Sequence, residues 1–337
     1  MSEIATKHVN KDDSSGIRET LAKRGLAVDK FIRYIAIAVL FIAFSITAKN
    51  FFTMRSILSM ALQTSAITIM GIGETFAIIT AGIDLSIGSV IALSGTIAVM
   101  AAINGVPIWL SMIIGLLVGV VCGLLNGLMI TKMKLPPFIA TLGMMMVARG
   151  VALTITNANA WPAPETFGVL GNGAIFETGP QFPGISYPVL VMIAVAIIFS
   201  FILGKTRLGR YTYAVGSNEE AARRAGINVN RVKTITYIFS GLLAALVGII
   251  LASRMTTSQP NSAIGYEMNA IAAAVIGGTS LMGGVGTIGG AVLGSFIIGI
   301  LTVGLTMAGA NYFMQQIVIG LVVIGSVAID QLKGRKN

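Results

Sequence analysis

Two acidic residues, Glu74 and Asp84, lie within or between long apolar stretches of the sequence, and Arg149 lies within another. A charge in the interior of a membrane is costly and usually serves a function. Glu74 and Asp84 are therefore candidates for a translocation path, or for the titrating group of an ion-coupled transporter. The only histidine, His8, lies in the polar N-terminal segment. We expect no paired acidic dyad and no catalytic histidine within the apolar stretches, which argues against an intramembrane enzyme.

Asp84 belongs to the heptad at residues 82–88, GIDLSIG, in which glycines flank an Asp and a Ser that can bond to local backbone. This pattern is typical of a break between two helices. A similar heptad, GTSLMGG, occupies residues 278–284, and both heptads join consecutive apolar runs. We interpret the pair as an internal duplication, and paired helix breaks in transporters lie near the path. The candidate path or break residues are Glu74, Gly82, Asp84, Ser86, Gly88, Asn269, Gly278, Thr279, Ser280 and Gly284.

A short charged segment predicts a solvent-exposed helix of about two turns. Asn218 is a favourable N-cap, acidic residues follow in the first turn, basic residues occupy the last turn, and Gly226 is placed to end the helix. A helix of about 10 Å is marginal in water, so it needs a surface to pack on. Its alanines form a strip of small residues that would fit a groove on a soluble partner, or lie on the chain's own membrane domain. The segment comprises Asn218, Glu219, Glu220, Ala221, Ala222, Arg223, Arg224, Ala225 and Gly226.

Two glycine motifs match nucleotide-binding loops only in part. Residues 284–289 satisfy G-x-G-x-x-G, but they lack the preceding strand and the later acidic residue of a dinucleotide site. Residues 204–206, GKT, match the end of a phosphate loop, but Phe199 stands where the first glycine is required. We expect this chain to bind no cofactor and no metal, so that any ATP is bound by another subunit.

Glycine also recurs every fourth residue from Gly115 to Gly127 and from Gly286 to Gly294. This spacing lets a neighbouring helix backbone approach closely, so we predict that both glycine rows are packing seams.

The composition places all of these residues in a membrane protein. Of the 337 residues, 55% are hydrophobic and only 11% are charged, and the mean hydropathy is +0.87. Soluble domains carry about 25% charged residues, so a soluble globular fold is excluded, and the apolar content excludes disorder. We predict an all-α, polytopic membrane protein with about ten transmembrane helices, some of them broken or re-entrant.

Ten apolar runs have lengths suited to a bilayer core of roughly 30 Å, although the eighth run is short enough to be a half-helix or a re-entrant segment. These runs are residues 32–48, 57–81, 87–103, 108–130, 136–156, 187–203, 234–252, 269–282, 285–307 and 313–329.

The distribution of Lys and Arg predicts the orientation, because cytoplasmic segments retain these residues. With both termini in the cytoplasm, 19 of the 23 Lys and Arg residues fall on the inside. The net charge of +10 thus reflects topology, and we expect no nucleic-acid partner.

The predicted organisation has three parts: a cytoplasmic polar tail at 1–31, a transmembrane domain at 32–330 and a cytoplasmic basic tail at 331–337. The transmembrane domain includes an extracytoplasmic loop at 157–186 and a cytoplasmic loop at 204–233 that carries the short charged helix. The extracytoplasmic loop is either a cap over the helix ends or a docking surface for a partner.

The sequence contains four motifs, in order along the chain: residues 82–89 (GIDLSIGS), 135–143 (LPPFIATLG), 214–218 (AVGSN) and 265–280 (GYEMNAIAAAVIGGTS). Together these four blocks resemble the ribose-type monosaccharide permease family of ATP-binding-cassette importers. Glu220-Ala221-Ala222 followed by Gly226 also resembles the coupling-helix signature of importer permeases. The resemblance covers roughly residues 35–333.

This resemblance implies a multi-pass permease in the plasma (inner) membrane of a prokaryote, surrounded by lipid. Its implied partners are a second permease chain, identical or different, a cytoplasmic ATPase that binds ATP and Mg, and an extracytoplasmic sugar-binding protein. The helix at 218–225 would sit in a cleft on the ATPase and transmit its closure, and the loop at 157–186 would meet the binding protein. Ribose is the favoured cargo among pentoses and hexoses, and relatives also carry other small polyols or nucleoside-like cargo. The alternative is an ion-coupled secondary transporter in which Glu74 or Asp84 titrates.

Overall fold

The computed structural model describes residues 31, 33–177, 179 and 182–334. Of the two predicted tails, residues 1–30 and 335–337 lie outside the described residues, whereas residues 331–334 continue the last helix, Tyr312–Gly334. The described chain is predominantly helical, and its only strands are two antiparallel pairs of two residues each. The prediction of an all-α protein is confirmed.

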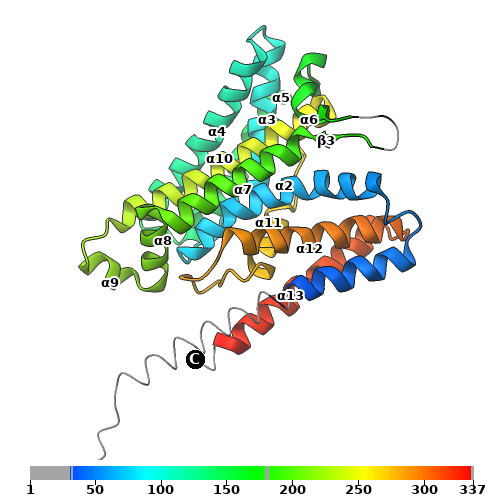
Figure 1. Ribbon diagram of the computed structural model, residues 1–337. Helices are drawn as coiled ribbons and strands as arrows, with labels where there is room; N and C mark the ends of the chain where they lie inside the picture. The colour runs from blue at the N-terminus through cyan, green and yellow to red at the C-terminus, as the bar shows by residue number, and fades with distance from the viewer. Residues whose placement is uncertain (1–30, 32, 178, 180–181, 335–337) are drawn as a thin grey trace, which may run out of the picture.

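The helices follow one another along the chain, and the longest connection, at 157–186, holds most of the minor elements (Figure 1). After a first apolar helix, Arg33–Thr47, they are α2 (Met54–Ile79), α3 (Ile87–Ile103), α4 (Ile108–Thr131), α5 (Pro137–Thr156), α6 (Val169–Asn172), α7 (Tyr187–Lys205), α8 (Arg207–Ser217), α9 (Glu219–Arg224), α10 (Val229–Met255), α11 (Tyr266–Ile276), α12 (Ile288–Met307) and α13 (Tyr312–Gly334). The minor elements are β1 (Trp161–Pro162), a 3-10 turn (Glu165–Gly168), β2 (Ala174–Ile175), β3 (Ile185–Ser186) and β4 (Thr257–Ser258).

Six of these helices are long and apolar enough to cross a membrane: α2, α4, α5, α7, α10 and α12. Shorter apolar helices lie at Arg33–Thr47, in α3, in α11 and in α13. The chain is thus a polytopic membrane protein. Each predicted apolar run overlaps one of these helices, but the number of crossings and the sides of the termini stay predictions.

The eighth predicted run, 269–282, has different bounds in the structure. The helix there is α11, Tyr266–Ile276, which begins three residues earlier and ends six residues earlier. The helix ends at Gly277 and Gly278. Gly278 has a φ of +85°, a backbone conformation that residues with a Cβ rarely adopt. The heptad 278–284 is therefore a helix break, as its glycines predicted.

The glycine row of α4 forms a packing seam with α10, as predicted. A Cβ atom at Gly119 would overlap the carbonyl oxygen of Gly241, and one at Gly123 would lie 2.8 Å from the Cα of Ile238. In the second row, Gly290 and Gly294 act in the same way between α12 and the end of α11, since a Cβ at either would overlap a backbone oxygen. Gly286, the first glycine of that row, precedes α12 and lies against Thr279 instead. Only glycine permits these helix separations.

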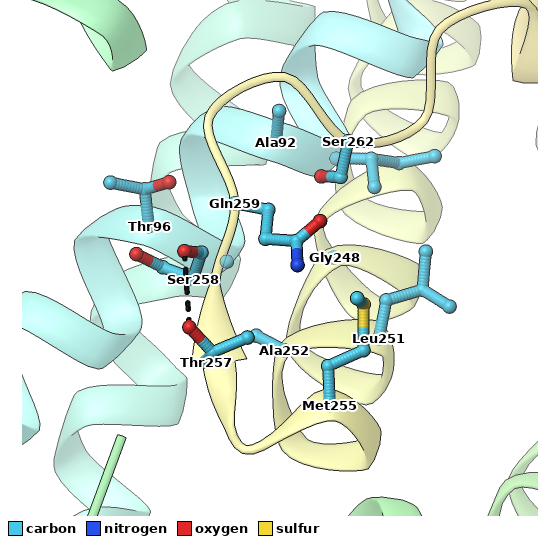
Figure 2. Close-up of a pocket in the computed structure, with 12 residues that line it drawn as sticks. Ala92, Thr96, Gly248, Leu251, Ala252, Met255, Thr257, Ser258, Gln259 and Ser262 are labelled. Atoms are coloured by element: carbon cyan, nitrogen blue, oxygen red, sulfur yellow. Dashed lines mark hydrogen bonds between the residues drawn. The ribbon is translucent and has the colours of Figure 1, made fainter. Parts of the chain in front are cut away.

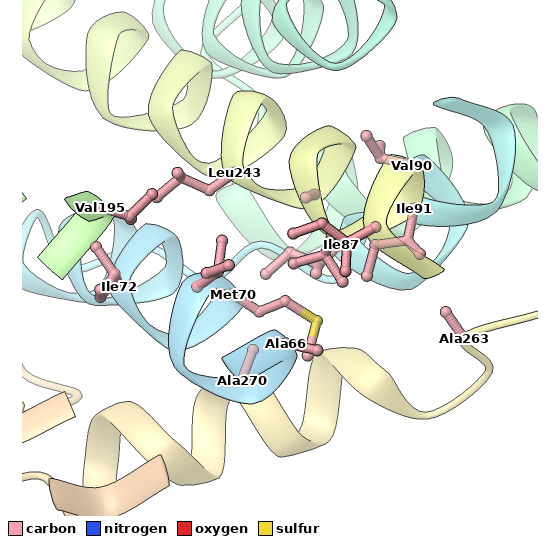
Figure 3. Close-up of a cluster of buried hydrophobic side chains, with 14 of the residues drawn as sticks. Ala66, Met70, Ile72, Ile87, Val90, Ile91, Val195, Leu243, Ala263 and Ala270 are labelled. Atoms are coloured by element: carbon pink, nitrogen blue, oxygen red, sulfur yellow. The ribbon is translucent and has the colours of Figure 1, made fainter. Parts of the chain in front are cut away.

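The largest apolar cluster lies where α2, α3, α7, α10 and α11 meet (Figure 3). Phe76, Phe199 and Phe239 pack edge to face within it, with ring centroids 5.1–5.8 Å apart. Peripheral helices instead expose large apolar side chains, such as Ile46 and Phe313, as expected for surfaces in contact with lipid. The polar residues described below sit on the central helices.

The short elements gather at the two ends of the helix bundle. α8 and α9 lie at one end, whereas α6 and β3 lie at the opposite end (Figure 1). The connection at 157–186 folds onto the end of α10, because the Gly171 N–H donates to Ser253 Oγ over 2.8 Å and β1 pairs with β4. This arrangement supports the cap interpretation, and docking of a partner stays a prediction.

Candidate functional site

The predicted charged helix exists as α9, and its ends have the expected geometry. Asn218 is extended, and its side chain accepts a hydrogen bond from the Ala221 N–H over 2.9 Å, as an N-cap does. Arg223 donates to Glu219 over 2.9 Å, and Arg224 pairs with Glu220 one residue further along. Acidic residues therefore stabilise the start of α9 and basic residues its end.

Contacts with its own chain fix α9 in place. Lys233 of α10 donates to Glu219 over 2.6 Å. This hydrogen bond is the main cause that lowers the pKa of Glu219, and the nearby charges of Lys233 and Arg223 also lower it. The ion pair thus ties α9 to the first turns of α10.

The alanines of α9 do not form one strip, and in this respect the sequence interpretation was wrong. Ala222 is buried against Val215, Val229 and Val232, whereas Ala221 and Ala225 are exposed. The short helix turns Ala222 toward α8 and α10 because that side offers apolar partners. Only Ala221 and Ala225 remain available to another protein.

A charged groove of about 370 Å³ lies beside α9. It is bounded by the α4–α5 connection on one side and by α9 and α10 on the other. Its charged lining residues are Lys134, Glu219, Arg223 and Lys233. Arg223 and Lys233 both pair with Glu219, and Lys134 adds a third basic group, so the groove keeps a net positive charge.

α8 was not predicted, because residues 207–217 were read as part of a loop. Thr206 accepts a hydrogen bond from the Gly209 N–H over 3.3 Å and begins the helix. The Tyr213 hydroxyl donates to the carbonyl oxygen of Gly286 over 2.6 Å. Burial raises the pKa of Tyr213, so this hydroxyl remains a donor at neutral pH.

Asp84 is buried at the break between α2 and α3, and three donors surround its carboxylate. The N–H and the hydroxyl of Ser86 donate to Oδ1 over 3.0 and 2.6 Å, and the Ser240 hydroxyl donates to Oδ2 over 2.7 Å. Asn126 of α4 extends the network, since its side-chain amide donates to Ser86 over 2.9 Å. Asp84 therefore joins the break to α10 directly and to α4 through Ser86.

Glu74 lies next to Asp84, and this pair of acids was not predicted. The Asp84 N–H donates to Glu74 Oε1 over 3.2 Å, and both side chains are buried. Three buried oxygen atoms in this region have no hydrogen-bond partner in the described structure: Glu74 Oε2, Asn126 Oδ1 and Tyr237 Oη. The sequence analysis missed Asn126, Tyr237 and Ser240 as site residues. Their polar side chains within apolar helices were the available signal, but only the fold shows that these three residues lie near the break.

The two predicted helix breaks lie side by side. The Gly284 N–H donates to the carbonyl oxygen of Ile79 over 2.9 Å, and a Cβ at Gly283 would lie 3.0 Å from the Cβ of Ala81. Thr279 is buried next to Gly286, and Ser280 is half-buried. The structure thus brings the 82–88 and 278–284 segments together, while their origin by duplication stays a prediction.

The remaining candidates lie at the start of α3 and on α11. A Cβ at Gly88 would overlap the carboxylate of Glu267 and the carbonyl oxygen of Ala263, so α11 approaches α3 closely there. Asn269 is half-buried on α11, two residues after Glu267. Gly82 similarly lies against the hydroxyl of Tyr237. These glycines allow backbone and polar side chains to meet beside the breaks.

A non-helical segment, 256–265, made of the short strand β4 followed mainly by turns, connects α10 to α11. Arg149 of α5 donates to the carbonyl oxygens of Pro260 and Ser262 over 2.6 and 2.8 Å. These bonds account for the charge that the sequence places inside an apolar run. Arg149 therefore supports a non-helical backbone.

A small pocket lies between this segment, α3 and α10 (Figure 2). Its volume of about 10 Å³ has room for one water molecule. The buried hydroxyl oxygens of Thr96 and Ser258 face no partner in the described structure, so a water molecule would satisfy them. Small-molecule sites measure roughly 300–1,000 Å³, so this pocket does not accommodate a solute.

A comparison with known protein families shows the family to which this chain belongs. The family model described as "Branched-chain amino acid transport system / permease component" matches residues 56–327. The chain belongs to this permease family. The matched region includes both helix breaks and also the helices α8 and α9.

The permease is similar over nearly its whole length to characterised relatives. It is 39% identical to the ribose import permease protein of Haemophilus influenzae over 306 residues, which cover 90% of this chain and 94% of that protein. It is 41% identical to the ribose import permease protein of Escherichia coli K12, over 89% and 92% of the two chains. It is 37% identical to the L-arabinose transport system permease protein of the same organism, over 95% of each chain.

Proposed function

We propose that this chain is the membrane-spanning permease subunit of an ATP-driven importer for a monosaccharide, with ribose as the favoured substrate. Its membership of the permease family and its similarity to ribose and arabinose permeases support the transport role. By this proposal the protein is not itself an enzyme, and it resides in the inner membrane of a bacterium.

The observation that carries ATP coupling is α9. It is capped, matched in charge to its dipole and held firmly by Lys233 and by the cluster around Ala222. A helix fixed in this way can transmit a push from a soluble protein without unfolding. We propose that a separate ATPase, which binds ATP and Mg, contacts Ala221 and Ala225 and places acidic side chains in the neighbouring groove.

The other partners follow from the same proposal. A second permease chain completes the path, and an extracytoplasmic sugar-binding protein docks on the connection at 157–186.

An ion-coupled transporter is the second candidate function, because Glu74 and Asp84 are buried together. The firmly anchored α9 favours the importer, since a secondary transporter has no need of such a helix.

Uptake into membrane vesicles distinguishes the two candidates. The importer requires ATP and is indifferent to a protonophore, whereas a proton-coupled transporter loses uptake when the protonophore is added. Ribose, arabinose and allose should each be tested as substrates.

The docking surface is tested by Ala221→Arg. Arginine favours helix and is tolerated on a free surface, but it would collide with a protein packed closely on α9. We expect normal insertion and loss of the co-purifying ATPase. Arg231→Ala, an exposed change on α10, is the control and should retain the ATPase. If Ala221→Arg binds its ATPase and transports normally, α9 is not the docking helix.

A further inference from the structure

α8 lies between α9 and the two helix breaks. Ser217 ends α8, and Asn218 begins α9. Val215 of α8 packs in the same apolar cluster as Ala222 of α9 and Val229 at the start of α10. Because packed side chains resist compression, a displacement of α9 also displaces α8.

The C-terminal half of α8 contacts both breaks. The Tyr213 hydroxyl donates to Gly286 at the end of the second break over 2.6 Å. A Cβ atom at Gly216 would overlap the carbonyl oxygen of Ile79, where α2 ends, and would lie 2.6 Å from the nitrogen of Gly284. The Gly284 N–H itself donates to the Ile79 carbonyl over 2.9 Å. Gly216 therefore sits against the hydrogen bond that joins the two breaks.

We propose that Tyr213 and Gly216 are positioning residues that transmit movement of α9 to both helix breaks at once. This inference rests on the proposed function, because it requires an ATPase that moves α9. Tyr213 holds the second break, and Gly216 allows the α8 backbone to rest on the junction of Ile79 and Gly284. α3 begins at Ile87, within the first heptad, and α12 begins at Ile288, four residues after the second, so a shift of the junction reorients both helices.

Two matched pairs of variants separate this role from simple packing. Tyr213→Phe removes only the hydroxyl that bonds Gly286, and Tyr211→Phe removes a hydroxyl from an exposed side chain of the same helix. Gly216→Ala places a methyl group against Ile79, whereas Gly204→Ala places one where no other atom lies within 4 Å.

The experiment reconstitutes the complete transporter in proteoliposomes and measures the amount of sugar taken up per ATP hydrolysed. The sugar is whichever of ribose, arabinose and allose the wild type transports fastest. We expect Tyr213→Phe to lower this ratio roughly fivefold, which corresponds to the net value of about 1 kcal/mol for one hydrogen bond. Gly216→Ala should lower it at least as much, and both control variants should keep the wild-type ratio.

A merely structural role would give another result. It would lower uptake and hydrolysis in proportion, together with the melting temperature, and the ratio would stay unchanged. That result, or wild-type behaviour of Tyr213→Phe, overturns the inference. Because Tyr213→Phe adds no atoms, it decides the question even if Gly216→Ala does not fold. Failure of the proposed function looks different, since no ATPase would then co-purify with the wild-type chain, and the inference would fall with it.

Discussion

At the scale of single residues, Asp84 supports a helix break through three donated hydrogen bonds from Ser86 and Ser240. Asp84→Asn keeps the shape and one carbonyl oxygen, so we expect appreciable transport and a modest loss of stability. Asp84→Leu leaves the donors buried without an acceptor, at a cost of about 1–3 kcal/mol for each. Melting temperature in detergent and sugar uptake should therefore fall much further for Leu than for Asn. Equal loss of transport in both variants would show instead that the negative charge itself is required.

The Glu219–Lys233 ion pair predicts a dependence on pH. The pKa of Glu219 in the folded protein lies below its ordinary value of 4.5, mainly because Lys233 donates a hydrogen bond to it. The unfolded chain therefore binds a proton more readily, so the stabilisation is present above pH 4.5 and is lost as the pH falls through the lower, folded-state value. Glu219 is partly exposed, which makes the effect small. The melting temperature of wild type should exceed that of Glu219→Gln at neutral pH, and the difference should shrink in acid. A constant difference would contradict this explanation.

Local residue patterns predicted local features well. The N-cap at Asn218 follows from its own side chain and the next three residues, and the structure confirms it. The burial of Ala222 and the partnership of Asp84 with Ser240 could not be predicted in this way. Both depend on segments that meet only in the folded protein, and Ser240 lies 156 residues from Asp84.

At the scale of elements, the α4–α10 seam is sensitive to single methyl groups. Gly119→Ala forces a Cβ into the backbone of Gly241, whereas Gly143→Ala on α5 meets no atom within 4 Å. Overpacking of this kind costs about 1–3 kcal/mol, so Gly119→Ala should lower the melting temperature in detergent. Gly143→Ala should leave it unchanged. Equal melting of the two variants would indicate that the seam can open without cost.

Helix positions were predictable wherever long apolar runs existed, because length and hydropathy are strong signals of a membrane helix. α8 and α11 were not fully predictable. α8 is short and polar, and it folds because it packs against α9 and the breaks. α11 begins at Tyr266, directly after Gly265 with a φ of +83°, and hydropathy does not indicate this start.

At the scale of the whole molecule, the orientation can be tested by chemical labelling. Phe176→Cys, at an exposed position in the 157–186 connection, should react with an impermeant thiol reagent in intact cells. Ala225→Cys, exposed at the end of α9, should react only after permeabilisation. Cys122 should first be replaced by Ala in both variants. Labelling of both cysteines from outside would contradict the proposed orientation.

The non-helical segment 256–265 that Arg149 supports has a consequence for how the protein is made. α11 has only 11 residues, or about 16 Å of helix, and the backbone before it cannot satisfy its own hydrogen bonds in lipid. During synthesis we therefore expect this stretch not to insert into the bilayer on its own. It should insert only after the earlier helices have packed and α12 has emerged from the ribosome. We expect a nascent chain truncated at residue 287 to leave α11 accessible to protease, and a chain extended through α12 to protect it.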